Sequence, residues 1–196
     1  MTSEPDATSR WSEASDVLRG ADYDARWQQL AASGRSVHGE ADFVCRLAPS
    51  SVLDAGCGTG RVAIELAARG IDVVGVDLDP PMIGHARAKA PHLRWVQEDL
   101  CSLALGRTFD VVAMPGNVMI FLCPGTETSV VANLAGHLAP GGALVAGFQL
   151  GRGYDLDRYD ADCAAAGLGL DARYATWECD PWVDGGGYAV SVHRSD

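Results

Sequence analysis

The chain has 196 residues, of which 47% are hydrophobic and 21% charged. This length fits one globular domain, and the hydrophobic content excludes a mainly disordered chain. Fifteen basic and 26 acidic residues give a net charge of -11, so binding to nucleic acid or to an anionic membrane is not expected. No apolar run is long enough to cross a bilayer, and the polar N-terminal segment does not resemble a secretory signal.

The six cysteines are scattered through apolar segments, and no two of them form a C-x-x-C pair. Reduced, buried thiols in a cytoplasmic protein are therefore expected, rather than a disulfide framework or a zinc site. The histidines show no metal-ligand spacing with one another, so no metal site is predicted.

The N-terminal part of the chain is divided into two segments. Residues 1–16 are polar and lack periodicity, which predicts a flexible tail. Residues 17–48 are expected to form a helical lid region, with one helix from Asp22 to Ala32 and another from Glu40 to Leu47, ending before Pro49.

Residues 49–196 are predicted to form the core, because strand and helix patterns alternate there. Such an order produces right-handed crossovers and a mainly parallel, doubly wound sheet with helices on both faces. The last two apolar runs, joined by turn residues, predict a C-terminal antiparallel hairpin and a seven-stranded sheet. Strands are expected at residues 51–54, 72–77, 93–96, 109–114, 143–148, 171–179 and 187–194, and helices at 61–69, 81–90, 127–138 and 155–166.

A glycine-rich loop between the first core strand and the first core helix is the strongest signal. Glycines at positions 56, 58 and 60 permit a sharp turn and let a ligand lie against bare backbone. A dinucleotide-binding loop has the spacing G-x-G-x-x-G, but Arg61 occupies the place of its third glycine. A Walker loop is excluded because no G-K-[ST] follows.

The segment Asp54-Ala55-Gly56-Cys57-Gly58-Thr59-Gly60 resembles motif I of the class I S-adenosylmethionine-dependent methyltransferases. The resemblance continues in order over about residues 40–194, through Asp77, Glu98-Asp99-Leu100, Phe109-Asp110-Val111-Val112 and Leu138-Ala139-Pro140-Gly141-Gly142. It implies a Rossmann-like fold, S-adenosylmethionine as cofactor and S-adenosylhomocysteine as product.

The same resemblance implies the roles of individual residues. Asp54 would face the ammonium group of the cofactor, Asp77 would accept from both ribose hydroxyls, and Asp99 would accept from the adenine amino group. Asp77 as a helix cap is the alternative, although Asp79 suits that role better; for Asp99 the alternative is an acidic residue in a solvated loop. The predicted cofactor-binding residues are Asp54, Gly56, Cys57, Gly58, Gly60, Asp77, Leu78, Asp99, Leu100 and Met114.

Candidate catalytic and substrate residues flank this set. Met114-Pro115-Gly116-Asn117 ends the fourth strand but lacks the Asn/Asp-Pro-Pro-aromatic motif, which argues against methylation of adenine N6 or glutamine. Asn117 is a candidate substrate contact or a plain turn residue. His38 is a candidate general base or a loop residue without chemistry. Tyr23, Trp27 and Arg35 are predicted to belong to the lid and to line the substrate pocket.

The function predicted from these residues is methyl transfer to a small-molecule acceptor by in-line displacement. Because the sulfonium already activates the methyl group, proximity and orientation are the main catalytic requirements. The alternative is a cofactor-binding module or partner subunit without turnover. A nicotinamide-dependent oxidoreductase is disfavoured by Arg61.

Overall fold

β1 and β4 lie side by side in the middle of a seven-stranded sheet in the computed structural model, which describes residues 9–13, 19–34 and 36–195. The strand order is β3-β2-β1-β4-β5-β7-β6, and β7 is the strand that runs antiparallel to its neighbours. The predicted fold class, including the C-terminal antiparallel hairpin, is therefore confirmed. The strands are β1 (Ser51–Ala55), β2 (Asp72–Asp77), β3 (Arg94–Gln97), β4 (Phe109–Met114), β5 (Leu138–Gln149), β6 (Leu168–Tyr174) and β7 (Tyr188–Ser195).

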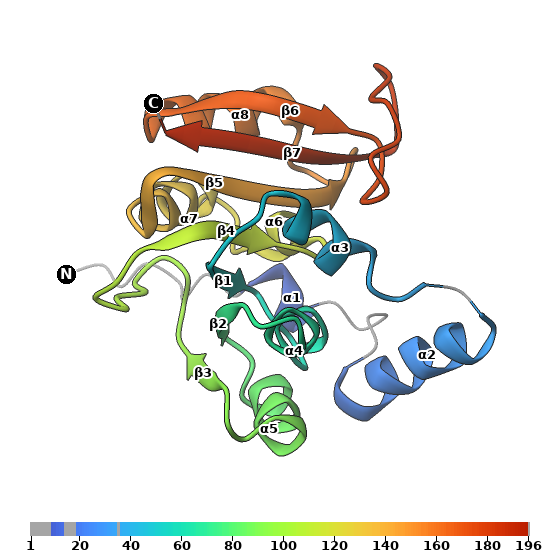
Figure 1. The fold of residues 1–196 in the computed structure, drawn as a ribbon. Coiled ribbons are helices and arrows are strands. Elements are labelled where there is room, and N and C mark those ends of the chain that lie inside the picture. The colour runs from blue at the N-terminus through green and yellow to red at the C-terminus, as the bar shows by residue number, and fades with distance from the viewer. Residues whose placement is uncertain (1–8, 14–18, 35, 196) are drawn as a thin grey trace.

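Helices cover both faces of this sheet (Figure 1). One face packs against α3, α4 and α5, and the other packs against α6, α7 and α8. The short α1 and the longer α2 precede this core, and α2 lies beside α5. The helices are α1 (Arg10–Glu13), α2 (Gly20–Ala32), α3 (Gly39–Arg46), α4 (Arg61–Ala68), α5 (Pro80–Lys89), α6 (Val118–Phe121), α7 (Glu127–Ala135) and α8 (Leu156–Ala165).

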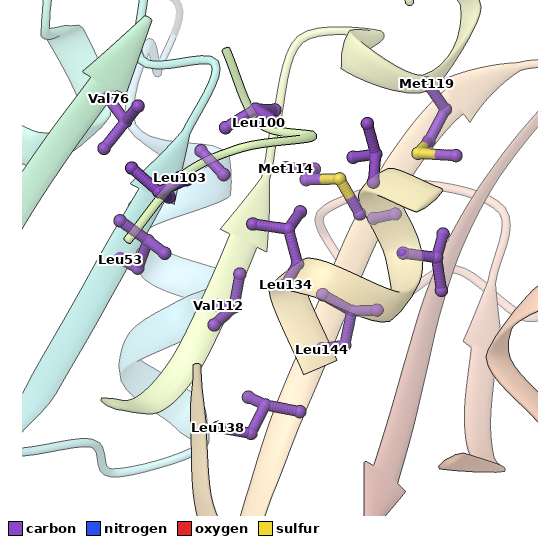
Figure 2. Close-up of a cluster of buried hydrophobic side chains, with 14 of the residues drawn as sticks. Leu53, Val76, Leu100, Leu103, Val112, Met114, Met119, Leu134, Leu138 and Leu144 are labelled. Carbon is purple, nitrogen blue, oxygen red and sulfur yellow. The ribbon is translucent and has the colours of Figure 1, made fainter. Parts of the chain in front are cut away.

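The apolar strands supply both layers of the core because successive side chains point to opposite faces of a sheet. In β1, Leu53 belongs to the cluster under α6, α7 and α8, whereas Val52 belongs to the cluster under α3, α4 and α5. Figure 2 shows the first cluster, in which Leu53, Val112, Leu134 and Leu144 lie close together. Both faces are buried, which explains why the strands read as nearly continuous apolar runs.

The Trp95 ring in β3 requires glycine at two positions that are distant from it in sequence. A Cβ atom on Gly75, in the middle of β2, or on Gly60, at the start of α4, would overlap the Trp95 indole ring. The indole Nε1 donates to the Ala90 carbonyl oxygen at 2.8 Å, which fixes the ring in this position. The glycines therefore allow an aromatic side chain to pack flat against two backbone segments.

The predicted boundary between the helix at 127–138 and the following strand is wrong. α7 ends at Ala135, and β5 begins at Leu138, which pairs with Phe109 before the register shifts to Val111 opposite Ala143. The sequence Pro140-Gly141-Gly142 therefore forms an irregularity within β5 rather than the end of a helix. Gly142 is needed there because a Cβ atom would lie 2.8 Å from the Ala139 carbonyl oxygen.

The C-terminal hairpin also differs from the prediction in its first strand. β6 spans Leu168–Tyr174, whereas a strand at residues 171–179 was expected. The chain leaves β6 after Tyr174, which forms an isolated bridge with Pro181. Cys179 has a positive φ of 70°, which is incompatible with a continued strand.

The N-terminal region combines two different structural roles. Within the segment predicted as a flexible tail, residues 10–13 form the helix α1, which packs against α6; residues 1–8 and 14–18 lie outside the described residues. α2 matches the helix that was predicted from Asp22 to Ala32. α3 does not lie over the site as a lid would, because its Phe43 and Val44 are buried in the core against the sheet. Of the predicted lid region, α3 therefore belongs to the core layer.

Candidate functional site

A pocket of about 160 Å³ opens at the carboxyl edge of the sheet, where β1, β2, β3 and β4 end. This is the edge at which open α/β sheets bind ligands. Eight of the ten predicted cofactor-binding residues line it: Asp54, Gly56, Cys57, Gly58, Asp77, Leu78, Asp99 and Leu100. The structure thus brings together predicted residues from three strand ends that are separated by up to 46 positions in sequence.

The glycine loop turns sharply from β1 into α4. Gly56 and Gly58 have φ values of 82° and 55°, in the left-handed region that favours glycine. The Gly56 N–H donates to the Val76 carbonyl oxygen at 2.8 Å, and the Gly58 N–H donates to the Asp77 carboxylate at 2.7 Å. The loop is therefore tied to the end of β2, which places its bare backbone along the pocket.

Gly60 differs from the other two glycines because it does not belong to the pocket lining. It has a φ of 82°, and its Cα faces the ring of Trp95, where a side chain would overlap the indole. Gly60 therefore serves packing and the entry into α4, and the predicted direct role in cofactor binding is not supported by its position.

Asp54 is a fully buried carboxyl group at the floor of the pocket. Its Oδ2 accepts from the Ala63 N–H at 3.1 Å, whereas Oδ1 is buried without a hydrogen-bond partner among the residues the structure describes. Burial, as the largest effect, raises the pKa of Asp54 to about 7. An ammonium group of a ligand would satisfy Oδ1 and neutralise the charge, so this residue fits the amino-acid end of the predicted cofactor.

Asp77 ends β2 beside the glycine loop, and its carboxylate is held by the backbone. Oδ2 accepts from the Gly58 N–H, and Oδ1 accepts from the Asp79 N–H at 2.9 Å. Burial raises the pKa of Asp77 above its ordinary value. Each carboxylate oxygen has a further lone pair, so both remain available to accept from ligand hydroxyls. Asp79 itself caps α5 by accepting from the Met82 N–H, so the helix-cap role belongs to Asp79, as predicted.

Asp99 and Leu100 follow β3 on the far side of Asp77 and contribute one end of the pocket. The Asp99 Oδ1 accepts from the Cys101 N–H at 2.8 Å, which orients the carboxylate within its turn. Leu100 is buried, whereas Leu78 is 48% exposed although it is a large apolar residue. An exposed leucine in a pocket lining suits contact with a flat apolar group of a ligand.

Cys57 is a buried thiol in the glycine loop and lines the pocket. Burial and the nearby Asp54 raise the pKa of this thiol well above its ordinary value. The Cys57 side chain is thus a neutral, apolar wall rather than a nucleophile.

α2 is attached to the glycine loop and to α5 by polar contacts. The Thr59 hydroxyl donates to Asp24 at 2.6 Å, and the Lys89 ammonium contacts both oxygens of the same carboxylate at 2.9 Å. Tyr23 lines the pocket, as predicted for a lid residue. Trp27 does not line the pocket; its ring packs against the guanidinium of Arg61, which does. Arg35, which was also expected in the lid, lies outside the described residues.

The two candidate catalytic residues lie outside the pocket lining. His38 precedes α3, and its Nδ1 is 3.4 Å from a carboxylate oxygen of Glu65. Asn117 has a φ of 70°, and its Oδ1 accepts from the N–H of Gln149, the last residue of β5, at 2.8 Å. Asn117 therefore joins the ends of β4 and β5. This position fits the alternative prediction, that Asn117 is a turn residue.

Met114, predicted to contact the cofactor, is fully buried in the core. Figure 2 shows it near Met119, and both belong to the cluster beneath α6 and α7. Because side chains alternate along a strand, the last residue of β4 points into this layer instead of toward the carboxyl edge. The pocket is lined at that point by Pro115 and Gly116.

Several lining residues were missed by the sequence reasoning. They come from α1 and the residue before it, from α4 and α5, and from the segment after β4. Residues 1–16 were expected to form a flexible tail, and residues 118–121 were expected to pack in the core. Trp11 carried a signal, because a lone tryptophan in a polar segment seldom remains in solvent. The missed lining residues are Ser9, Trp11, Arg61, Val62, Met82, Val118, Phe121, Leu122, Cys123 and Thr126, and Pro115 and Gly116 line the pocket after β4.

Residues 9–13, 19–34 and 36–195 also provide information on metal binding and on membrane insertion. Within these ranges, no three His, Cys, Asp or Glu side chains are grouped so that they could hold a metal ion. No helix in the same ranges is both long and apolar enough to cross a membrane.

Comparison with known proteins gives a consistent result. Residues 52–142 match the family model described as a methyltransferase domain. The chain is 35% identical over 128 residues to the dTDP-3-amino-3,4,6-trideoxy-alpha-D-glucopyranose N,N-dimethyltransferase of Streptomyces venezuelae, covering 65% of this chain and 51% of that protein. It is 30% identical over 190 residues to a trans-aconitate 2-methyltransferase of Methylobacterium nodulans, covering 89% and 72%.

A solved structure agrees with these relatives. The chain superposes with a TM-score of 0.83 and 37% identity on a TehB-like SAM-dependent methyltransferase from Corynebacterium glutamicum, over 89% of this chain and 96% of the other. The chain spans about half the length of the first curated relatives that it matches. With the glycine loop and the strand-end carboxylates in one pocket, these matches show that the chain belongs to the class I S-adenosylmethionine-dependent methyltransferases, as the sequence predicted.

Proposed function

We propose that this protein binds S-adenosylmethionine in the pocket at the carboxyl edge of the sheet and transfers its methyl group to a small-molecule acceptor. One observation supports the proposal most directly: Asp54, Asp77 and Asp99, from three strand ends, line one pocket beside the glycine loop. S-adenosylhomocysteine is the product that leaves.

The order of these carboxylates supports one orientation of the cofactor. The unpartnered, buried Oδ1 of Asp54 suits the ammonium group. Asp77, held by the Gly58 and Asp79 N–H groups, suits the ribose hydroxyls. Asp99 and Leu100 suit the polar edge of adenine, and Leu78 suits its apolar face. The residues present therefore fit the group that the family uses.

The bound cofactor supplies a methyl group already activated by the sulfonium. The chain's own task is to hold the acceptor in line with the methyl group and to exclude water, which makes orientation the principal catalytic effect. No histidine belongs to the lining residues of the described chain, and Tyr23 is the phenol among them. We therefore assign no general base to His38 and infer that the acceptor binds in a form that is already nucleophilic.

Small acceptors are supported by two observations. The relatives named above act on a nucleotide-linked amino sugar and on trans-aconitate, both small molecules. The chain's net charge of -11 disfavours a phosphate backbone as the acceptor. Its six cysteines are all free thiols, which supports the predicted cytoplasmic location because reducing compartments keep thiols unpaired.

The test compares two aspartates at opposite ends of the same strand. Asp77 ends β2 in the pocket, whereas Asp72 begins β2 and pairs with Arg107 at 2.7 Å. Hydrogen bonds to charged groups are worth about 1.5–3 kcal/mol, so Asp77→Ala should weaken S-adenosylhomocysteine binding about ten- to a hundredfold in calorimetry. Asp72→Ala, the matched control, should bind with wild-type affinity.

Turnover is measured separately from binding. Labelled S-adenosylmethionine is incubated with a panel of amines, hydroxy acids and thiols, and methylated product is detected by mass. Product with at least one acceptor supports the proposal. Tight binding without product on any acceptor would favour the non-catalytic module, and no binding by the wild type would contradict the proposed site.

A further inference from the structure

Trp11 lies over one half of the pocket and is held there by contacts on both sides. Its indole Nε1 donates to the Asp79 carboxylate at 2.7 Å, on the β2 side of the pocket. Its ring meets the Phe121 ring edge-on, with the centroids 5.4 Å apart, on the β4 side. α1 therefore bridges two segments that flank the mouth of the site.

The Asp79 contact identifies which half of the pocket Trp11 covers. The Asp79 N–H donates to Asp77, the carboxylate proposed to hold the ribose, so one residue joins Trp11 to the ribose position. Phe121 lies in a segment that also supplies Leu122, Cys123 and Thr126 to the pocket lining. The Thr126 carbonyl oxygen lies 4.0 Å from the sulfur of Cys101, next to Leu100. Trp11 thus faces the adenosyl end, away from Asp54.

An ion pair adds to the docking of α1. The Arg10 guanidinium lies 3.3 Å from Oε1 of Glu127, a carboxylate with no solvent exposure. Glu127 also accepts from the Gly125 N–H at 2.7 Å and lies 3.2 Å from the Arg158 guanidinium. A buried carboxylate surrounded by partners is a fixed anchor, so Arg10 restricts where the neighbouring Trp11 can lie.

We propose that Trp11 is a binding residue for the adenosyl half of the cofactor and, with Leu78, Leu100 and Phe121, completes an apolar box around the adenine. This inference rests on the proposed function, since it takes the orientation given by Asp54 and Asp77. Aromatic side chains in contact with a base contribute enough that their removal lowers affinity several-fold to about a hundredfold.

The experiment separates the two halves of the cofactor. Calorimetry is carried out with S-adenosylhomocysteine and with 5′-methylthioadenosine, which has the adenosyl half but lacks the amino acid. Trp11→Ala should weaken both ligands by the same factor, about tenfold or more. Asp54→Asn should weaken S-adenosylhomocysteine and leave methylthioadenosine unchanged, because only the first carries the ammonium group.

Two further variants isolate the contacts of Trp11. Trp11→Phe keeps an aromatic ring but removes the hydrogen bond to Asp79, so its affinity should fall between those of the wild type and Trp11→Ala. Trp182→Ala removes a tryptophan from the segment between β6 and β7, outside the pocket lining, and should bind both ligands as the wild type does. A single cooperative urea transition, with the protein fully native at the concentration of the binding assay, establishes that each variant is folded.

The outcomes distinguish this inference from the proposed function. Unchanged methylthioadenosine affinity in Trp11→Ala, together with weakened binding in Asp77→Ala, would overturn the role of Trp11 while leaving the site intact. A Trp11→Ala variant that raises the KM of an acceptor without weakening methylthioadenosine would likewise overturn it. A wild type that binds neither ligand would overturn both proposals.

Discussion

The Arg61 guanidinium lies 3.9 Å from the centroid of the Trp27 ring. Arg61 is the first residue of α4, directly after the glycine loop, and Trp27 belongs to α2. The same guanidinium pairs with both carboxylate oxygens of Glu40 in α3 and donates to the Val37 carbonyl oxygen. Arg61, which disfavours a dinucleotide-binding loop, thus joins α2, α3 and the segment between these helices to the glycine loop.

Arg61→Met should destabilise the folded protein, because it leaves the buried Glu40 carboxylate without its partner. Removing one member of a buried ion pair costs about 3–5 kcal/mol. Urea denaturation measures the loss. The double variant Glu40→Gln/Arg61→Met should recover part of the stability, since no unpaired charge remains. Equal stability of the single and double variants would contradict this account.

Cofactor binding should depend on pH through Asp54. The ammonium group of the ligand favours the ionised carboxylate, whose pKa in the free protein is about 7. Affinity for S-adenosylhomocysteine should therefore fall about tenfold between pH 8 and pH 6, because the ionised fraction falls by that factor. Calorimetry at several pH values tests this, and Asp54→Asn should flatten the profile. A wild-type profile that is already flat would count against the assignment.

The effect of pH on the stability of the free protein, as far as Asp54 determines it, should be opposite to its effect on affinity. Folding raises the pKa of this group from 3.8 to about 7, so the native state binds the extra proton between these values. Its contribution to stability therefore falls as the pH rises from about 4 to 7, by up to about 4 kcal/mol. Asp54→Asn should raise the urea midpoint more at pH 8 than at pH 5. A larger gain at pH 5 would refute the sign of the effect.

Gly60→Ala should destabilise the fold far more than a matched glycine variant. Both Gly60 and Gly70 have positive φ values, 82° and 85°, so an alanine is strained at either site. At Gly70 the added methyl group meets nothing within 4 Å, whereas at Gly60 it overlaps Trp95. We expect a loss of about 1–2 kcal/mol for Gly70→Ala from backbone strain and about 1–3 kcal/mol more for Gly60→Ala. Thermal denaturation of both variants tests this difference.

His38→Ala should leave turnover nearly unchanged. Its ring contacts Glu65 and does not line the pocket, so it is not placed to take a proton from the acceptor. Loss of a general base lowers rates by about 10²–10⁴, whereas loss of this surface contact should change kcat less than about threefold. A pH–rate profile of the wild type and the variant decides between them: a rising limb that disappears in the variant would restore His38 as the base.

Elements with strong local signals were predictable from the sequence alone. β2 at Asp72–Asp77 and β4 at Phe109–Met114 match the expected strands to the residue, because short apolar runs between turn residues specify them locally. The glycine loop and the acidic residues after β2 and β3 also carried enough information to identify the family. Parallel topology follows from the alternating order of elements, and it alone places Asp54, Asp77 and Asp99 at one edge.

Long-range packing decided the features that the sequence did not reveal. Gly60 is a glycine because Trp95, 35 residues later, occupies the space of its side chain. Met114 points into the core because alternation in β4 and the position of α6 determine its face, although its place at a strand end suggested the pocket. Helix α1 brings Trp11 to the site through the ion pair of Arg10 with Glu127, 117 positions away, and the hydrogen bond of Trp11 to Asp79, 68 positions away. No local pattern encodes these contacts.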